Sequence, residues 1–491
     1  MTMSLNRLMA IALLAVVPAT SFALPIDWHG AFGVDSTLIS GYRRVKATTD
    51  QTSTNDGSQE VGLDNGGKGS ANWLSYVFKL APTMIINDAA TFKAELTTDY
   101  ASGGMLGDSS QTDANGTNNI PVYYHNQAKG STVNIKKAYL ELYSDTATYM
   151  IGRHTYQWGL GAIYNDGSNT WDRHASSRDG ITMKLKVGNF HVHPFWSKVA
   201  NTGLTTATDV KEYGVGLLYD NAERDIAFGI MYGVKSSNGS NTTITSTIQT
   251  PTAQPVGATD VKITDIFLKK TWDKFDIAVE VPLMSGDLGR TITGGPVVSY
   301  STKAILAQTN YRANDSWTLG LDGGHVNGHD GSASKFGALY LNPNYQVANL
   351  LYRYNIGAIG TKGNNNGVNG SVYDSYITNS MYLKLRSSYS TEKWVFDTAI
   401  IYAKALEVAE AGKSAYNHTK NKIFTAATTQ ADDLGTEIDM NATYKWNNEI
   451  SIGAGLGYLI TGDYFSYTND ANVKNEAKSS LLLQVNTSVT F

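Results

Sequence analysis

Charged side chains of both signs are concentrated in residues 149–190, where the sequence has the clearest potential for chemistry. They are Arg153, Asp166, Asp172, Arg173, Arg178 and Asp179, and Lys184 and Lys186 follow at alternate positions. Guanidinium groups bind carboxylates and phosphates through paired hydrogen bonds. These arginines can therefore bind an anionic solute, or they can pair with the neighbouring aspartates and only hold a loop in place. The sequence leaves both interpretations open.

Catalytic and metal-binding patterns are weak in this chain. His191 and His193 share one face of a predicted strand and could share a metal ion, but no third ligand is near and the adjacent lysines would repel a cation. His154, which we place on the outward face of its strand, has no serine partner for hydrolysis. No G-x-S-x-G, H-E-x-x-H or glycine-rich phosphate-loop motif occurs. We expect no enzyme activity, no catalytic residue, no metal and no cofactor.

The elements that position these residues are strands, because apolar and polar residues alternate along most of the chain. Clear examples are FDIAVEV at 275–281, GITMKLKV at 180–187, EIDMNATYKW at 437–446 and SIGAGLGYLI at 451–460. A period of two indicates strands with one apolar and one polar face. Together they present more apolar surface than one soluble core absorbs, which favours a transmembrane barrel with lipid outside and water inside.

Short and long connections alternate between the predicted strands. The short ones are NDAA, SDTA, Gly188-Asn189, NAER, WDK, ANDS, STEK and NNE, and the long polar ones lie at about 46–70, 103–131, 160–178, 200–209, 237–258, 286–297, 329–371, 408–434 and 464–477. Outer-membrane barrels have short periplasmic turns and long outer loops. The pattern predicts an all-β, antiparallel barrel of about 18 strands, with 16 as the alternative. Because a strand at 342–355 would make the count odd, we interpret 329–371 as one outer loop that folds into the barrel.

The N-terminus is typical of a secretory signal peptide. Arg7 precedes an apolar run over residues 8–17, and Ser21 and Ala23 are small enough for signal peptidase. We predict a signal peptide over 1–23 and a single barrel domain over 24–491. The chain has no cysteine and a formal net charge of −4, which excludes disulfides and argues against nucleic-acid binding.

The most distinctive stretch, YMIGRHTYQWGLGAIYNDGSNTWDRHASSRDGITMKLKVGNF at 149–190, resembles a strand–loop–strand segment of alginate-export-like and related substrate-selective porins. In those porins G-R-x leads to a G-x-G loop and R-D-G opens the next strand. Here these positions are Gly152-Arg153-His154, Gly159-Leu160-Gly161 and Arg178-Asp179-Gly180. YLNPNYQVANLLYRYN at 340–355 is similar to an inward loop of such porins. The resemblance implies an 18-stranded outer-membrane porin from a Gram-negative bacterium, and it does not carry alginate over as the solute.

The terminal Phe491 follows a strand in which Leu481, Leu483, Val485 and Val489 share one face, whereas Gln484, Asn486, Ser488 and Thr490 share the other. We expect this strand to close the barrel against residues 29–42. In barrels of this type a terminal aromatic residue resembles the signal read by the barrel-assembly machinery. We expect an interfacial aromatic girdle that includes Tyr156, Trp158, Trp196, Tyr213, Trp272, Trp317, Trp394, Tyr444 and Trp446.

Charges on the inner faces of the strands would set the properties of a pore. By alternation we place Lys93, Glu95, Asp99, Lys137, Glu141, Arg153, Lys184, Lys186, Asp276, Glu280, Lys384, Arg386, Glu437, Asp439 and Lys445 inside. The loop at 160–178 and the loop at 329–371, with Tyr352 and Arg353, would narrow the pore. Opposite signs on facing walls would then orient dipolar solutes.

Two functions remain open from the sequence. The first is a porin in the bacterial outer membrane that allows passive diffusion of small hydrophilic solutes and ions. The second is a structural or adhesive barrel with an occluded pore. The expected partners are outer-membrane lipids and lipopolysaccharide, the assembly machinery and small solutes, with no nucleic acid. The strand faces allow a homotrimer without specifying one.

Overall fold

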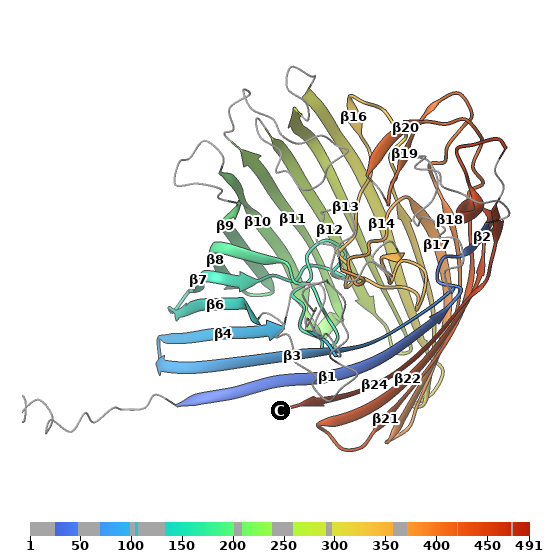
Figure 1. Cartoon of the computed structure of the whole chain (residues 1–491). Helices are drawn as coiled ribbons and strands as arrows, with labels where there is room; N and C mark the ends of the chain where they lie inside the picture. The colour runs from blue at the N-terminus through green and yellow to red at the C-terminus, as the bar shows by residue number, and fades with distance from the viewer. Residues whose placement is uncertain are drawn as a thin grey trace, which may run out of the picture.

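The computed structural model describes residues 25–47, 69–98, 104–106, 133–200, 209–237, 259–290, 297–356, 371–419, 421–472 and 475–491. Within these residues the chain forms a closed antiparallel barrel of eighteen strands (Figure 1), which confirms the predicted fold class. No helix among the described residues is long and apolar enough to cross a membrane. The predicted signal peptide over 1–23 lies outside the described residues.

The strands of the barrel pair in sequence order with their neighbours. They are β1 (Ile26–Ser40), β3 (Ser70–Asn87), β4 (Ala90–Thr98), β6 (Val133–Tyr143), β7 (Ala147–Thr155), β8 (Ser177–Val187), β9 (Phe190–Ala200), β10 (Val210–Asn221), β11 (Ile226–Ser237), β12 (Asp260–Thr271), β13 (Phe275–Arg290), β14 (Val297–Arg312), β15 (Trp317–Val326), β17 (Ser380–Ser390), β18 (Trp394–Ala405), β21 (Asp433–Lys445), β22 (Ile450–Thr461) and β24 (Ser480–Thr490).

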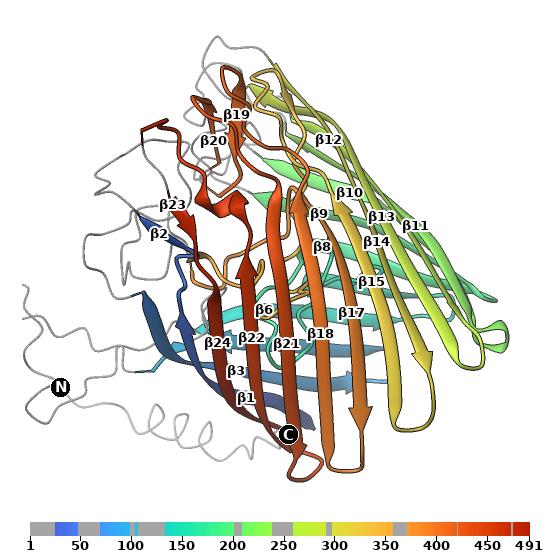
Figure 2. The same cartoon turned by 90° about the vertical axis from the view of Figure 1, so that its right-hand side faces the viewer.

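Short extra strands lie in the long connections. β5 (Gly104–Met105) pairs with β3, β16 (Lys335–Phe336) pairs in parallel with β14, β2 (Val45–Ala47) pairs with β23 (Asn475–Ala477), and β19 (Ser414–Asn417) forms a hairpin with β20 (Lys422–Thr425). Of these, β2, β19, β20 and β23 lie at the end of the barrel opposite the tight turns (Figure 2). The bounds of the barrel strands confirm that connections of two to four residues alternate with longer ones. The long connection predicted at 286–297 is shorter than expected, because β13 extends to Arg290 and β14 begins at Val297.

The barrel closes between its first and last strands, as the sequence predicts. β1 pairs with β24 from Ala31↔Thr490 to Ser40↔Leu481. Phe491 extends this ladder, because its N–H donates to the Gly30 carbonyl at 3.0 Å and its carbonyl accepts from the Gly30 N–H at 2.8 Å. A Cβ at Gly30 would lie 2.5 Å from the Phe491 ring, so glycine makes room for the terminal side chain. The role of Phe491 in assembly stays a prediction.

The outer surface is apolar, as a lipid-facing barrel requires. Leu217, Ile230, Ile266, Leu385 and Ile400 are all 42–58% exposed on their strands. Closure of the barrel hydrogen-bonds its first strand to its last strand. This is necessary because lipid offers no hydrogen-bond partner to a free backbone group. This surface places the chain in the bacterial outer membrane, as the sequence predicts.

Aromatic side chains lie at the ends of the apolar surface. Trp196, Tyr213, Trp272, Trp317, Trp394 and Trp446 are 42–64% exposed, as girdle residues are. The prediction is wrong for Tyr156 and Trp158, which are 6% and 4% exposed and pack inside the barrel with Phe195 and Met231. Both follow the end of β7, where the chain has already turned inward, so a position near a strand end did not indicate an interfacial position.

Candidate functional site

Two connections turn into the barrel and fill part of its interior. The first inward loop (residues 156–176) joins β7 to β8, and the second inward loop (residues 327–379, described over 327–356 and 371–379) joins β15 to β17. Both coils are visible inside the wall in Figure 1. The segment 342–355 is not a strand, in agreement with the expectation that it belongs to a loop.

The first inward loop is held at its start by a carboxylate of the wall. Glu280 on β13 is fully buried and accepts a hydrogen bond from the Leu160 N–H. Gly159 has a φ of +54°, and a Cβ there would lie 2.5 Å from Glu280 Oε2. The glycine of the G-L-G motif is therefore required both by the backbone conformation and by the approach to Glu280.

Wall lysines hold the tip of the first inward loop through its carbonyl groups. Lys79 on β3 and Lys136 on β6 both donate to the Gly167 carbonyl, at 3.0 and 2.6 Å, and Lys79 also donates to the Asn169 carbonyl. Glu95 on β4 balances this charge, because its carboxylate lies 2.7 Å from the Lys136 ammonium. An ammonium group offers three donors and so can satisfy several loop carbonyls at once.

Arg173 fastens the end of the same loop to strands β1 and β3 of the wall. Its guanidinium donates to Asp35 on β1 at 3.1 Å and to Ser75 on β3 at 2.7 Å. The Arg173 and Asp35 side chains are 7% and 2% exposed, so this is a buried ion pair. The guanidinium also lies 3.7 Å from the ring centre of Tyr373, which belongs to the second inward loop. The Tyr373 hydroxyl donates to Asp35 at 3.4 Å, so Asp35 joins the wall to both loops.

The second inward loop is held by wall carboxylates that accept its backbone amides. Glu437 on β21 accepts from the N–H groups of Leu350 and Leu351 at 2.6 and 2.7 Å, and Asp439 accepts from that of Asn349 at 3.1 Å. Lys384 on β17 adds the opposite interaction, donating to the Val347 carbonyl at 2.8 Å.

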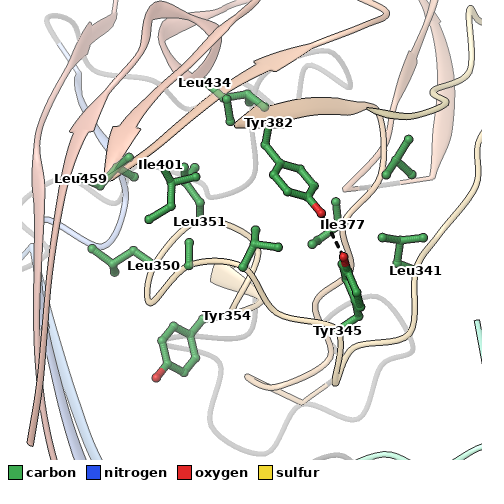
Figure 3. Packing of buried hydrophobic residues seen from close by; sticks show 14 of the residues in the cluster. Leu341, Tyr345, Leu350, Leu351, Tyr354, Ile377, Tyr382, Ile401, Leu434 and Leu459 are labelled. Atoms are coloured by element: carbon green, nitrogen blue, oxygen red, sulfur yellow. Dashed lines mark hydrogen bonds between the residues drawn. The ribbon is translucent and has the colours of Figure 1, made fainter. Parts of the chain in front are cut away.

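Apolar side chains of the second inward loop pack against the inner face of the wall. Leu350 and Leu351 of the loop lie beside Ile401 and Leu459 of the wall strands, as Figure 3 shows. Leu341, Tyr354 and Leu434 belong to the same buried cluster. The hydroxyl groups of Tyr345 and Tyr382 lie 3.2 Å apart and link loop to wall within this cluster. The loop thus has its own hydrophobic core inside the barrel.

The two loops are bonded to each other as well as to the wall. The Asn342 N–H donates to the Ala162 carbonyl at 2.7 Å, and the Asn344 side chain donates to the His174 carbonyl at 2.7 Å and to Asn165 Oδ1 at 3.0 Å. With anchors on β1, β13 and β21, the joined loops cross the interior of the barrel.

A cavity of about 240 Å³ remains between the second inward loop and the wall strands β17, β18 and β21. Its charged lining consists of Arg353, Lys384, Arg386, Asp397 and Asp439, with amide and hydroxyl groups between them. Arg386 is held by a two-point contact to Asp322, at 2.8 and 3.1 Å, whereas Asp397 is exposed. The cavity is thus polar and carries both signs of charge.

The structure corrects the prediction that Arg153 points into the lumen. Arg153 lies on the outer face of β7 beside the exposed Ile135, Ile151 and Ile181, and it forms a two-point ion pair with Asp179 at 2.7 Å. Asp179 is therefore also on the outer face, not at a pore.

His154 points inward instead, where it is fully buried and contacts Thr182 Oγ1 at 2.7 Å. The prediction failed because the inner face of β7 is packed: it carries the buried Met150 and His154, and the charged Arg153 lies on the other face.

The other predicted site residues in and beside the first inward loop stabilise its conformation. Asp166 and Asp172 accept hydrogen bonds from loop amides of Ser168 and Asn169. Arg178 on β8 points inward but is 2% exposed, and its guanidinium lies 3.9 and 3.4 Å from the ring centres of Tyr156 and Phe195. The structure thus brings these residues together as supports for the loop.

Other predicted site residues lie on inner surfaces. Lys184 and Lys186 are exposed and share the inward face of β8 with buried Thr182. Tyr352 has a φ of +66° and its hydroxyl contacts that of Ser380, while Arg353 bonds to Gln346 and borders the cavity. Asp99 lies outside the described residues. Apart from Arg153, the remaining strand residues that were predicted to point inward do lie on inward faces.

Three anchor residues were missed by sequence reasoning: Asp35, Lys79 and Lys136. Lys136 precedes Lys137 on β6, and because alternation places Lys137 on the inner face it assigns Lys136 to the outer face. A register shift between Glu95 and Leu96 of β4 marks a bulge here, and both Lys136 and Lys137 reach Glu95, at 2.7 and 2.9 Å. Alternation does place Asp35 and Lys79 on the inner face, but nothing in the sequence indicates which loop residues they contact.

Metal ligands do not converge anywhere in the described part of the chain, where no three His, Asp or Glu side chains form a group that could hold an ion. The rings of His191 and His193 are 6.3 Å apart, centre to centre.

No family model and no curated protein sequence matches the chain. Solved structures with a similar backbone include three from Pseudomonas aeruginosa. OccK5 (OpdH) is 9% identical with a TM-score of 0.47, and the match covers 95% of this chain and 98% of OccK5. OpdQ is 11% identical with a TM-score of 0.47, and the match covers 95% of this chain and 98% of OpdQ. The outer membrane protein opdK is 9% identical with a TM-score of 0.48, and the match covers 95% of this chain and 99% of opdK. Identity this low leaves the solute and activity of this chain to its own residues.

Proposed function

We propose that the chain is a porin of the bacterial outer membrane that lets small hydrophilic solutes and ions diffuse through a water-filled path narrowed by its two inward loops. The observation that carries this proposal is the charged cavity between the second inward loop and β17, β18 and β21. Its lining of arginine, lysine and aspartate side chains favours water and polar solutes over lipid.

The way the loops are held supports a narrowed path and not a tight plug. The loops are fixed at defined points of the wall, by Asp35, Glu280 and Glu437, so their distance from the rest of the wall is set by the fold. We assign no catalytic role to any residue, because passive diffusion needs only an open path and a concentration gradient.

A swelling assay tests the proposal against an occluded scaffold. Liposomes that contain the purified, folded protein are diluted into isotonic solutions of arabinose, glucose, sucrose and raffinose. We expect swelling with the smaller sugars and a rate that falls steeply with solute size. Swelling no faster than in protein-free liposomes for every solute would support the occluded structural or adhesive barrel instead.

A further inference from the structure

Outside the candidate path, one part of the outer loops is built around buried histidines. The connection between β18 and β21 (residues 406–432) carries the β19–β20 hairpin, and His418 lies at its turn. His418 is 9% exposed and its ring lies 5.0 Å from that of Tyr416. The hairpin rests on the beginning of the second inward loop, where Gly331 leaves no room for a Cβ because it would lie 2.6 Å from the Ala415 nitrogen.

Both ring nitrogens of His418 face hydrogen-bond donors from the second inward loop. The His329 N–H donates to Nε2 at 2.8 Å, and the side-chain nitrogen of Asn379 lies 3.4 Å from Nδ1. The orientation of the Asn379 amide is set by Glu407, whose N–H donates to its oxygen at 2.7 Å and whose carbonyl accepts from its nitrogen at 2.8 Å. A neutral imidazole can accept one hydrogen bond here, whereas an imidazolium can accept none.

The two contacts of His418 lie at the two ends of the second inward loop. His329 lies three residues beyond the end of β15, and Asn379 directly precedes β17. The His329 ring is itself 1% exposed and packs between Phe336 and Tyr416, at 4.8 and 4.6 Å between ring centres. His418 therefore connects the outer hairpin to both legs of the loop that borders the cavity.

We propose that His418 is a proton-operated latch: in its neutral form it docks the outer hairpin onto the base of the second inward loop, and its protonation releases the hairpin. The added proton would place an N–H against the His329 N–H and remove the only acceptor that the ring offers to the loop. The consequence for transport rests on the proposed function, but the docking itself does not.

The sign of the pH dependence follows from burial. Burial, and then the charge of His329, lower the pKa of His418 from 6.5 to about 3. A histidine whose pKa is lowered in the docked state favours docking above its free value, and this preference is lost as the pH falls. If the released His418 has its ordinary pKa of about 6.5, the ratio of docked to released hairpin falls about 100-fold between pH 7.5 and pH 4.5.

The other titratable groups around the latch can be separated from His418. Burial also lowers the pKa of His329, which lies 3.5 Å from Asp330, so its protonation acts in the same direction. Burial and the neighbouring Asp330 and Glu410 raise the pKa of Glu407. Protonation of this acid removes a repulsion and therefore favours docking in acid, opposite to His418.

Spin-label distances test the latch without any measurement of transport. The chain has no cysteine, so Ser414→Cys on the hairpin and Ser285→Cys on β13 place two labels on exposed positions of the full-length protein. We expect one narrow distance at pH 7.5 and a broader, shifted distribution at pH 4.5. In His418→Gln, whose amide oxygen can accept from His329 and cannot be protonated, the narrow distance should persist at both pH values.

Three results would overturn the latch. One is a narrow, unchanged distance in the labelled protein down to pH 3.5. Another is the same acid response in His418→Gln as in the parent, which would assign the response to His329 or to the acids. In His418→Ala the distribution should be broad at every pH, and a narrow one would show that His418 does not hold the hairpin.

Discussion

The two inward loops occupy one lumen but are stabilised by different interactions. The first is held by charge: Lys79 and Lys136 bind its carbonyls, and Arg173 forms a buried ion pair with Asp35. The second is held by an apolar cluster that includes Leu351 and by wall carboxylates that bind its amides. The difference shows two ways of fixing irregular backbone inside a barrel, where every buried polar group needs a partner.

The two kinds of anchoring should also fail differently. A buried charge left without its partner is strongly destabilising, because the remaining charge keeps its desolvation cost. An apolar cluster loses contacts in smaller steps, as each truncated side chain leaves a cavity. The first loop should therefore respond to the loss of one residue more sharply than the second.

The largest effect should come from Asp35→Ala. It leaves Arg173 buried without its carboxylate, at a cost of about 3–5 kcal/mol, which favours release of the first inward loop. Trypsin cleavage after Arg173 in the folded barrel should become faster. Asp397→Ala, which removes an exposed lumen carboxylate, is the matched control and should leave cleavage unchanged. Equal protection of Arg173 in Asp35→Ala would show that the ion pair does not hold the loop.

Leu351→Ala should loosen the second inward loop. Leu351 is 1% exposed, and removal of a fully buried leucine side chain costs about 2–5 kcal/mol. Hydrogen exchange over residues 345–354 should become faster, with the wall strands unaffected. Leu383→Ala removes the same atoms from a side chain that is 54% exposed on the outer face. If both substitutions have the same effect on residues 345–354, the apolar cluster is not what holds this loop.

Much of the barrel could be predicted from the sequence because strand alternation and turn length are local properties. The eighteen strands and the closing pair β1–β24 follow from them. The anchors could not be predicted, since Asp35 and Arg173 are 138 residues apart and nothing local to either names the other. The predicted face of Arg153 was wrong because the inner face of β7 carries the buried Met150 and His154 rather than the charged residue. Lys136 was missed because a bulge interrupts the period of two.

Glu437→Gln should have a smaller effect than either truncation. The amide keeps one acceptor for the Leu350 and Leu351 N–H groups but loses the charge that strengthens both bonds, at a cost of about 1.5–3 kcal/mol. Exchange of these two amides should accelerate while that of Tyr345 stays as it is. Glu392→Gln in a tight turn is the control. Unchanged exchange at Leu350 and Leu351 would remove Glu437 from the anchoring of the loop.

Arg353→Ala should have the smallest effect, on ion selectivity. Arg353 borders the cavity, and its loss should raise the cation-to-anion permeability ratio roughly twofold, equivalent to the few tenths of a kcal/mol typical of exposed charges. Arg153→Ala removes the same charge from the outer face and should leave the reversal potential in a salt gradient unchanged. A shift in Arg153→Ala with none in Arg353→Ala would contradict the faces assigned to the two arginines.

Single-channel recording of the parent protein and Asp35→Ala in planar bilayers tests whether the inward loops narrow a water-filled path. If the loops narrow a water-filled path, the parent gives discrete conductance steps, and release of the first inward loop from the wall makes those steps larger. The account is contradicted if the folded parent shows no steps, or if the steps keep their size in Asp35→Ala while trypsin shows that its loop has been released.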